Sequence, residues 1–326
     1  MGQRNARGKV PSAMTSLELA PYVGTVESRT QSWSALSLEE RKRRAARACL
    51  ERDSITLWQL TESYLYLFGP KGAKVSPHTL RTHKTSLEHL LHYSREHGLS
   101  LLKASSEDGA RYARDLERTF KPSSVGVRLA GGRLLYKALA WAGLEVGHPL
   151  LDVRPAPDPT AKWDKRRPYR EDELGKLLGL EQPLITRLVL LGAHAGLRVS
   201  ESLALEWRDV NFSSETLTVQ KGKGGKVRTV PLGGTLLRAL KAGKTEVRPL
   251  ELSTFTVRLR LIGACKTAKV EYLGYHALRH AAGTRMYRET GSLETVARFL
   301  GHSSLETARV YAKWSDEGLR SRLKGW

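Results

Sequence analysis

Two arginines, a lysine, two histidines and a tyrosine in the second half of the sequence are residue types that together can act on a phosphodiester. They are Arg198, Lys223, His276, Arg279, His302 and Tyr311. A tyrosine hydroxyl can attack phosphorus if guanidinium groups neutralise the charge that builds on the non-bridging oxygens, and the planar fork of arginine suits this task. A lysine can protonate the departing 5′ oxygen, while a histidine can accept or hydrogen-bond the phenolic proton. The set indicates cleavage of a DNA strand with no metal ion or other cofactor.

Arg198 is expected at a junction between two helices. An apolar helix over 184–193 should stop at Gly196, and a new helix should begin near Ser200. Glu201 follows Arg198 by three residues and could hold its guanidinium in place. Taken alone, Arg198 is more typical of a surface arginine.

Lys223 lies in a predicted β-hairpin. Two short alternating segments, over 216–220 and 226–232, flank the glycine-rich sequence Lys-Gly-Lys-Gly-Gly, so Lys223 stands between two glycines at the tip. The order of residues is not that of a P-loop. A structural hairpin with incidental lysines is the alternative reading of this segment.

His276, Arg279 and His280 are expected to share one face of a helix, because they are three and four residues apart. Two histidines at this spacing can also bind zinc. The general-base glutamate of the His-Glu-x-x-His motif is missing, however, and Arg279 would place a fixed cation where the metal would bind. We therefore expect no metal site here.

Tyr311 is predicted on a helix that follows a short break. Gly301 should end one helix, and Ser303 and Glu306 have the spacing of a capping box for the next, which carries Tyr311 about two turns along. A tyrosine in this position is also typical of ordinary half-buried packing.

The charge of the chain indicates a polyanionic partner. The 326 residues include 54 Lys and Arg against 33 Asp and Glu, a formal net charge of +21. The positive charge is spread along the chain and does not flank one amphipathic anchor, which favours nucleic acid over a membrane surface. We expect no secretory leader, because the first residues lead into no apolar h-region, and no apolar run reaches membrane-spanning length. The two cysteines, Cys49 and Cys265, form no Cys-x-x-Cys cluster. These features predict a cytoplasmic protein, associated with the nucleoid.

Apolar residues repeat at helical spacing between Cys49 and Leu151, which predicts a small basic helical domain. Ser76 and Pro77 are typical of a helix start, and Ser123 or Ser124 should open a later helix. Residues 152–168 contain four prolines and five basic residues, a composition typical of extended chain.

These observations predict four parts of the chain: a basic N-terminal extension over 1–48, a helical DNA-binding domain over 49–151, a linker over 152–167 and a catalytic domain over 168–326. The expected fold is mainly α-helical with a small antiparallel β-sheet, and the second domain is mixed α/β. Basic side chains in the first three parts are candidates for contact with DNA phosphates, although basic runs are also typical of solvated helix faces. The candidates are Arg41, Lys42, Arg43, Arg44, Arg81, Lys84, Arg128, Arg133, Lys137, Lys165, Arg166 and Arg167.

The motifs of the second half, taken in order, resemble those of the tyrosine recombinases, the group that includes phage integrases and Xer proteins. They read Gly-Leu-Arg-x-Ser-Glu, Gly-Lys-Gly-x-x-Lys, His-x-Leu-Arg-His, and Leu-Gly-His with a tyrosine nine residues after the histidine. The resemblance runs from about residue 168 to 312. The helical residues 49–151 look like the family's core-binding domain, although His148 stands where an asparagine is common.

This resemblance implies a role for each matching residue. Arg198 and Arg279 would bind the scissile phosphate, with Glu201 supporting Arg198, and Lys223 would be the general acid, with Lys221 and Lys226 as alternatives. His276 would be the base or hydrogen-bond partner. His302 would contact the phosphate, and Tyr311 would be the nucleophile that forms a 3′-phosphotyrosyl link.

The resemblance also implies partners. Family members act on double-stranded DNA as dimers or tetramers, in some cases with an accessory protein, and pass a C-terminal helix to a neighbour. Only 15 residues follow Tyr311 in this sequence, which predicts a short exchange or none.

Two other functions stay open at this point. A type IB topoisomerase uses similar residues but acts as a monomer with little site choice. A non-catalytic DNA-binding protein on the same scaffold would need only the positive charge, although the intact set of six residues argues against it. The sequence identifies neither the target site nor the choice among integration, excision and dimer resolution.

Overall fold

The computed structural model describes residues 24–160, 167–220, 227–244, 247–302 and 305–312. The chain divides into two compact units, Met1–Pro159 and Thr160–Trp326. The division falls inside the predicted linker. None of the helices in these ranges is long and apolar enough to cross a membrane.

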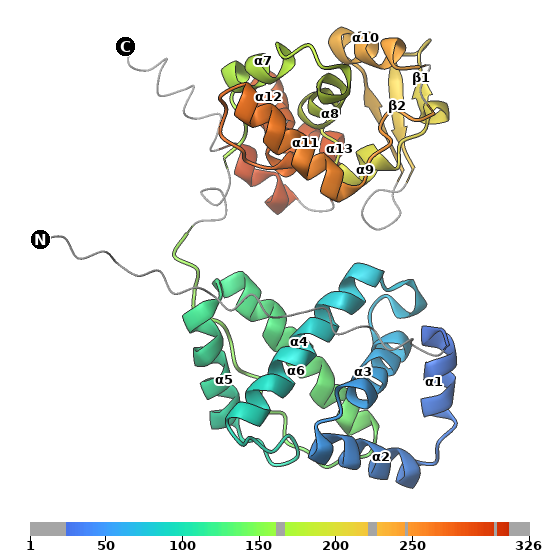
Figure 1. The fold of residues 1–326 in the computed structure, drawn as a ribbon, viewed down its shortest axis with the longest axis vertical. Helices are drawn as coiled ribbons and strands as arrows, with labels where there is room; N and C mark the ends of the chain where they lie inside the picture. The colour runs from blue at the N-terminus through green and yellow to red at the C-terminus, as the bar shows by residue number, and fades with distance from the viewer. Residues whose placement is uncertain (1–23, 161–166, 221–226, 245–246, 303–304, 313–326) are drawn as a thin grey trace, which may run out of the picture. The chain divides into compact units, whose positions relative to one another are not determined.

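In the described residues of the N-terminal unit, every regular element is a helix (Figure 1). Its elements are α1 (Val26–Ser34), α2 (Leu38–Glu51), α3 (Ser54–Phe68), the 3₁₀ turn η1 (Gly72–Lys74), α4 (Pro77–Glu96), α5 (Ser106–Thr119) and α6 (Pro122–Trp141). The predicted start of α4 is confirmed, because Ser76 Oγ accepts a hydrogen bond from the backbone N–H of Thr79 and Pro77 occupies the first helical position. Helix α6 starts slightly earlier than predicted, at Pro122.

The prediction that residues 1–48 form an extension is wrong for the part that the structure describes. Helices α1 and α2 belong to the N-terminal unit, and Trp33, Ala45 and Ala48 are buried in its core. The buried face of α2 consists of short side chains at helical spacing, which the neighbouring basic cluster obscures in the sequence. Small side chains allow close packing of helices, so this face needs no large apolar residue.

The C-terminal unit is mixed, with a small three-stranded antiparallel sheet beside a group of helices (Figure 1), which confirms the predicted fold class. Its elements are α7 (Glu171–Leu178), α8 (Pro183–Ala193), α9 (Val199–Leu203), η2 (Trp207–Asp209), β1 (Val210–Asn211), β2 (Thr216–Val219), β3 (Arg228–Pro231), α10 (Gly234–Ala242), α11 (Thr254–Thr267), α12 (Tyr275–Thr290), α13 (Leu293–Leu300) and η3 (Leu305–Thr307).

The predicted hairpin is present as strands β2 and β3. Leu217 pairs with Val230, and Val219 pairs with Arg228 at the end nearest the turn. The turn itself, residues 221–226, lies outside the described residues, and with it Lys221, Lys223 and Lys226. In the sequence, the pair of Val219 and Arg228 flanks the segment that carries the candidate lysine.

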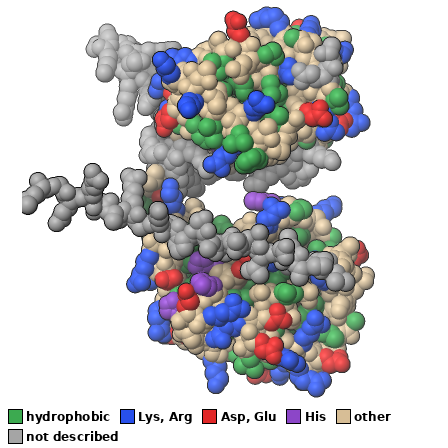
Figure 2. Space-filling view, viewed as in Figure 1, with side chains coloured by type: hydrophobic (Ala, Val, Ile, Leu, Met, Phe, Trp, Pro, Cys, Tyr) green, Lys and Arg blue, Asp and Glu red, His purple; other side chains and the backbone are tan. Residues whose placement is uncertain are grey.

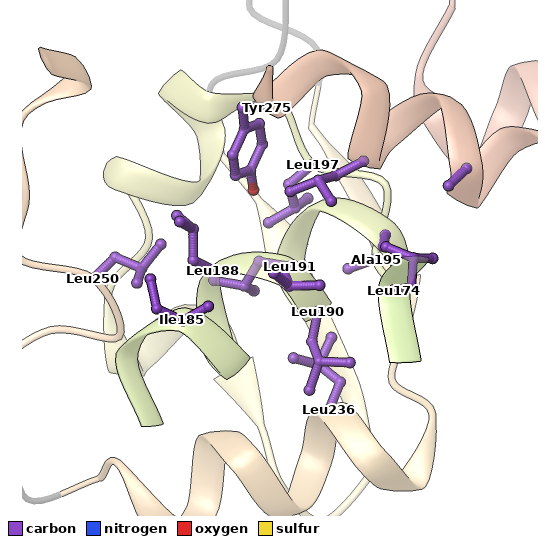
Figure 3. Close-up of a cluster of buried hydrophobic side chains, with 14 of the residues drawn as sticks. Leu174, Ile185, Leu188, Leu190, Leu191, Ala195, Leu197, Leu236, Leu250 and Tyr275 are labelled. Atoms are coloured by element: carbon purple, nitrogen blue, oxygen red, sulfur yellow. The ribbon is translucent and has the colours of Figure 1, made fainter. Parts of the chain in front are cut away.

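Helix α8 forms the centre of the C-terminal core. Four consecutive residues, from Leu188 to Leu191, are fully buried, as expected for a helix that is apolar on all sides. Side chains from other elements, including Leu174, Leu236 and Tyr275, surround it (Figure 3). Each fully buried leucine or valine contributes about 1.5–3 kcal/mol of stability relative to an exposed one.

Gly192 allows α8 to approach α12 closely. A Cβ atom at position 192 would lie 2.7 Å from Cβ of Leu278, a distance shorter than real contacts. Because Leu278 is next to Arg279, this close packing fixes the helix that carries one of the two predicted phosphate-binding arginines.

Candidate active site

Glu201 is the centre of a cluster of charged side chains in the C-terminal unit. Its side chain is 2% exposed. The backbone N–H of Arg198 donates to Glu201 Oε2 at 2.9 Å, and Nη1 of the same arginine donates to Oε1 at 2.6 Å. The contact expected from the three-residue spacing is therefore present at the start of α9.

A second arginine, Arg228 of β3, binds the same carboxylate with two hydrogen bonds. Its Nη1 donates to Glu201 Oε1 at 3.0 Å, and its Nη2 donates to Oε2 at 2.7 Å. The sequence analysis did not identify Arg228, because it is 27 residues from Glu201 and is one of several basic residues in the hairpin. No pattern in the sequence marks the pair.

The pKa of Glu201 reflects these contacts. Burial on its own would raise the pKa, but the hydrogen bonds and charges of Arg228 and Arg198 outweigh it and lower the pKa to about 2. The carboxylate is therefore ionised at neutral pH, and it balances part of the positive charge around it.

Arg279 lies fully buried in the first half of α12. Its Nη1 donates to the carbonyl oxygen of Gly196 at 2.6 Å, and its Nη2 donates to the carbonyl oxygen of Leu300 at 2.6 Å. Glu201 Oε2 is 3.6 Å from Arg279 Nη1. Arg279 thus joins the segment before Arg198 to the segment before His302.

The pKa of Arg279 is lowered to about 10, first by burial and then by the positive charge of Arg198. The guanidinium nevertheless keeps its proton at neutral pH. Arg198 and Arg279 lie in each other's field, and among the described residues the carboxylate paired with both is Glu201, which leaves a net positive charge that suits a phosphate anion.

Tyr311 lies in a helical turn over 309–312 and is 2% exposed. It packs with Val296 and Leu300 of α13 and with Ala308. Burial raises the pKa of its hydroxyl to about 12, although the charges of Arg279 and Arg198 act in the opposite direction. The buried phenol is therefore protonated at neutral pH.

Two imidazole rings lie beside Tyr311. His302 is stacked with it at 6.0 Å between ring centroids, and His280 lies at 5.4 Å in a tilted arrangement. Burial, together with the charges of Arg279 and Arg198, lowers the pKa of His302 to about 4, so its ring is neutral at pH 7. Gly301, in the left-handed conformation at the end of α13, gives the chain the turn that places His302 here.

His276 is exposed at the start of α12, and its ring meets that of His280 at 4.6 Å. The sequence placed His280 on the same helix face as His276 and Arg279 but gave it no role. His276, Arg279 and His280 are therefore on one helix, as expected. The ring of His280 lies between those of His276 and Tyr311, at 4.6 and 5.4 Å.

Several arginines predicted to contact DNA also contact aromatic rings of the N-terminal unit. In three pairs the guanidinium carbon lies over a ring centroid: Arg41 over Trp141 at 4.6 Å, Arg44 over Trp33 at 4.6 Å and Arg128 over Phe120 at 3.5 Å. Cation–π contacts of this kind stabilise the packing and hold the charge at the surface of the helices.

Arg133 and Arg167 have partners within the protein. Arg133 donates to the carbonyl oxygen of Leu150 at 2.8 Å and to that of Val153, which fastens the end of the helical unit. Arg167 is paired with Glu173 and Glu271. These contacts give both arginines a structural role, and their contact with DNA stays a prediction.

The remaining predicted DNA contacts are distributed over the surface. Arg43, Arg81 and Lys137 are exposed, Lys42 and Lys84 are half-buried, and Lys165 and Arg166 lie outside the described residues. Figure 2 shows Lys and Arg side chains scattered over this face of each unit, with acidic side chains among them. On this face, the positive charge does not mark a single binding surface.

Comparison with known proteins identifies the family. Residues 180–317 match the model of the phage integrase family, and residues 62–143 match the N-terminal SAM-like domain of phage integrases. The tyrosine recombinase XerC of Pelobacter propionicus is 31% identical over 73% of this chain and 85% of its own length. The tyrosine recombinase XerD of Rhizobium meliloti is 28% identical over 81% of this chain and 93% of its own length.

Solved structures agree with this assignment at the level of the fold. The XerH site-specific recombinase bound to a palindromic difH substrate covers 91% of this chain and 93% of its own, with a TM-score of 0.65 at 16% identity. A lambda integrase dimer bound to a COC′ core site covers 77% of this chain and 75% of its own, with a TM-score of 0.61 at 19% identity. With its motifs, both family domains and a relative above 30% identity in agreement, this chain belongs to the phage integrase family of tyrosine recombinases.

Proposed function

We propose that this protein is a site-specific DNA recombinase in which Tyr311 attacks the scissile phosphate and forms a 3′-phosphotyrosyl link. The observation that carries the proposal is the position of Tyr311. Its ring lies beside His280 and His302, and the charges of Arg198 and Arg279 act on its hydroxyl. Family membership supports the same activity.

In the proposed reaction Arg198 and Arg279 bind the non-bridging oxygens of the phosphate, where negative charge increases in the transition state. The tyrosine oxygen forms a bond to phosphorus while the bond between phosphorus and the 5′ oxygen breaks. Lys223 protonates the 5′ oxygen, with Lys221 and Lys226 as the alternatives. Attack by a 5′ hydroxyl on the phosphotyrosine reverses these steps and rejoins a strand, so the energy of the phosphodiester is conserved and no ATP is needed.

The phenolic proton of the nucleophile passes to an imidazole. We assign this role to His276, and His280 is the alternative because its ring lies 5.4 Å from that of Tyr311. His302, neutral at pH 7, donates a hydrogen bond to the phosphate.

Binding of DNA must uncover this site. Arg279 is fully buried, and Tyr311 is 2% exposed. A phosphate in a DNA duplex cannot reach either side chain in that arrangement. We therefore propose that Tyr311 moves out of its pocket when DNA binds, and that the hydrogen bonds of Arg279 to backbone carbonyls give way to bonds to the phosphate.

The substrate of this reaction is double-stranded DNA, and we propose that the protein acts on it as a homo-oligomer. The related lambda integrase was solved as a dimer on its core site. A protein with this substrate and a formal net charge of +21 would be associated with the nucleoid.

The test is recovery of covalently linked DNA. The protein is incubated with fragmented and nicked host DNA and denatured in detergent, and the DNA attached to it is isolated and sequenced. The wild type is expected to yield one recurrent sequence, which would also disclose the target site. Scattered sequences, together with relaxation of supercoiled plasmid, would support topoisomerase activity instead.

Two variants control this experiment. Tyr311→Phe removes the attacking oxygen and is expected to yield no linked DNA while it binds DNA as the wild type does. Tyr272→Phe removes a hydroxyl from a part-exposed tyrosine outside the cluster and is expected to behave as the wild type. Linked DNA from Tyr311→Phe would contradict the assignment of the nucleophile, and DNA binding without linkage by the wild type would indicate a non-catalytic protein.

A further inference from the structure

Arg228 contacts two of the segments that make up the proposed active site, α9 at Glu201 and the end of α13 at Gly301. It is the first residue of β3, five residues after Lys223 in the sequence, and its side chain is 10% exposed. Its guanidinium binds Glu201 of α9 with two hydrogen bonds, at 3.0 and 2.7 Å. We infer that Arg228 is a positioning residue, which fixes the phosphate-binding arginines and the lysine-bearing hairpin relative to one another.

The first argument concerns Arg198. Both oxygens of Glu201 are shared between the two arginines: Oε1 accepts from Nη1 of each, and Oε2 accepts from the backbone of Arg198 and from Nη2 of Arg228. Arg198 on its own makes one hydrogen bond to each oxygen, and Arg228 adds a second to each. The planar fork of Arg228 fixes the plane of the carboxylate, and the carboxylate in turn fixes the guanidinium of Arg198.

The second argument concerns His302. A Cβ atom at Gly301 would lie 3.0 Å from Cδ and 3.1 Å from Nη1 of Arg228, so the backbone before His302 lies directly against the arginine side chain. Gly301 also has a φ of 67°, which favours glycine. The charge of Arg228 contributes to the lowered pKa of His302, in keeping with this proximity.

The third argument concerns the hairpin. Val219 and Arg228 form the last pair of the β2–β3 ladder before the turn. Because Arg228 is bound to Glu201, this end of the β2–β3 ladder is fixed beside Arg198. Arg228 therefore connects the described part of the hairpin to the proposed phosphate site.

This inference rests on the proposed function. Its test uses the target sequence that the recovery experiment described under Proposed function is expected to yield, prepared as a nicked duplex that traps the covalent complex. Two forms of the duplex are compared, one with an ordinary scissile phosphate and one with an uncharged methylphosphonate at that position. The neutral linkage needs less neutralisation by guanidinium groups. A variant that fails because its arginines are misplaced should therefore regain activity on the methylphosphonate, whereas a variant with a damaged fold should not.

The variants are Arg228→Met, which removes the charge but keeps the length of the side chain, and Arg228→Lys, which keeps the charge but not the fork. Arg228→Met is expected to form the covalent complex about 100-fold more slowly on the phosphate, a loss typical of a misplaced electrostatic donor, and about tenfold more slowly or less on the methylphosphonate. Arg228→Lys should fall between it and the wild type. DNA affinity should stay within about twofold of the wild type, since Arg228 is not placed in contact with DNA.

Two further proteins calibrate the result. Arg198→Ala removes a phosphate-binding arginine directly and should show the same preference for the methylphosphonate. Arg238→Met removes an exposed arginine of α10 and should match the wild type on both duplexes. Equal losses on the two duplexes for both Arg228 variants, or no loss, would overturn the inference while leaving the proposed function intact. Absence of a covalent complex with the wild type would overturn both.

Discussion

The ring of Tyr311 lies directly against the backbone of Gly283 in α12, so closely that a Cβ atom at position 283 would be 2.4 Å from Cε1 of the tyrosine and 2.7 Å from Cζ. The pocket of the proposed nucleophile is therefore shaped by the absence of a side chain. The effect of filling this space on stability should therefore change sign when the tyrosine ring is removed.

Gly283→Ala is expected to destabilise the protein by about 1–3 kcal/mol, because the added methyl group overlaps the tyrosine ring. In a Tyr311→Ala background the same substitution should instead stabilise the protein, by up to about 1 kcal/mol, since alanine is a better helix former than glycine. Urea unfolding of the four proteins of this cycle measures both effects. A destabilising effect of the same size in both backgrounds would show that the overlap with Tyr311 is not the cause.

Glu201→Gln should destabilise the protein by about 3 kcal/mol at pH 7, because it leaves buried arginines without their carboxylate. The pKa of Glu201 is about 2 in the folded protein against an ordinary value of 4.5, so its ionisation stabilises the fold fully above about pH 4.5. This contribution is lost as the pH falls from about 4.5 towards 2. Unfolding free energies measured at pH 7 and at pH 3 should therefore differ by less in Glu201→Gln than in the wild type.

His302 should bind a proton at a lower pH than an exposed histidine does. Its pKa is lowered to about 4 from 6.5, because burial and the nearby arginines disfavour its charged form. The unfolded chain binds a proton at this residue between about pH 6.5 and pH 4 and the folded protein does not, so stability falls as the pH is lowered through that window. Histidine resonances followed by NMR, with His302→Gln to assign the signal, should show a ring that is still neutral at pH 5.5. A midpoint near 6.5 would contradict the burial of this ring among cations.

DNA binding should depend steeply on salt. If about ten phosphates are contacted, the slope of log K against log salt concentration should be about −9. Fluorescence anisotropy with a labelled duplex at several salt concentrations measures this slope. Lys137→Gln, which removes an exposed basic side chain of α6, should reduce the slope by about one if that lysine contacts a phosphate; an unchanged slope would remove it from the interface.

Many helix ends and the hairpin could be predicted from local sequence signals. The starts of α4 and α9, the end of α13 at Gly301 and the β2–β3 hairpin all follow from capping residues, glycines and alternation, which act over a few residues. Helices α1 and α2 were missed because the buried face of α2 consists of alanines and a cysteine beside four consecutive basic residues. In that segment the packing partner, and not the local pattern, decides which residues are buried.

The contacts within the site were harder to predict. The pairing of Glu201 with Arg198 follows from a spacing of three residues, whereas its pairing with Arg228 depends on how the sheet packs against α9. The burial of Tyr311 against Gly283 likewise depends on contacts between separate helices. Such long-range contacts have no local sequence signal, and this is why the motifs indicated the candidate reactive residues and Glu201 but not Arg228 or Gly283.

The bonds from Arg279 to the carbonyl oxygens of Gly196 and Leu300 bear on the design of inactive forms of this protein. The side chain of Arg279 joins the segment before Arg198 to the end of α13, and we also propose that it binds the substrate. Any replacement at 279 is therefore expected to affect both folding and catalysis. The side chain of Arg198 is 24% exposed, so its replacement should affect folding less. Changes at Arg198 or Tyr311 are therefore better suited to trapping an intact protein on its DNA, and a loss of function caused by a natural variant at Arg279 should be attributed to catalysis only after its abundance has been measured.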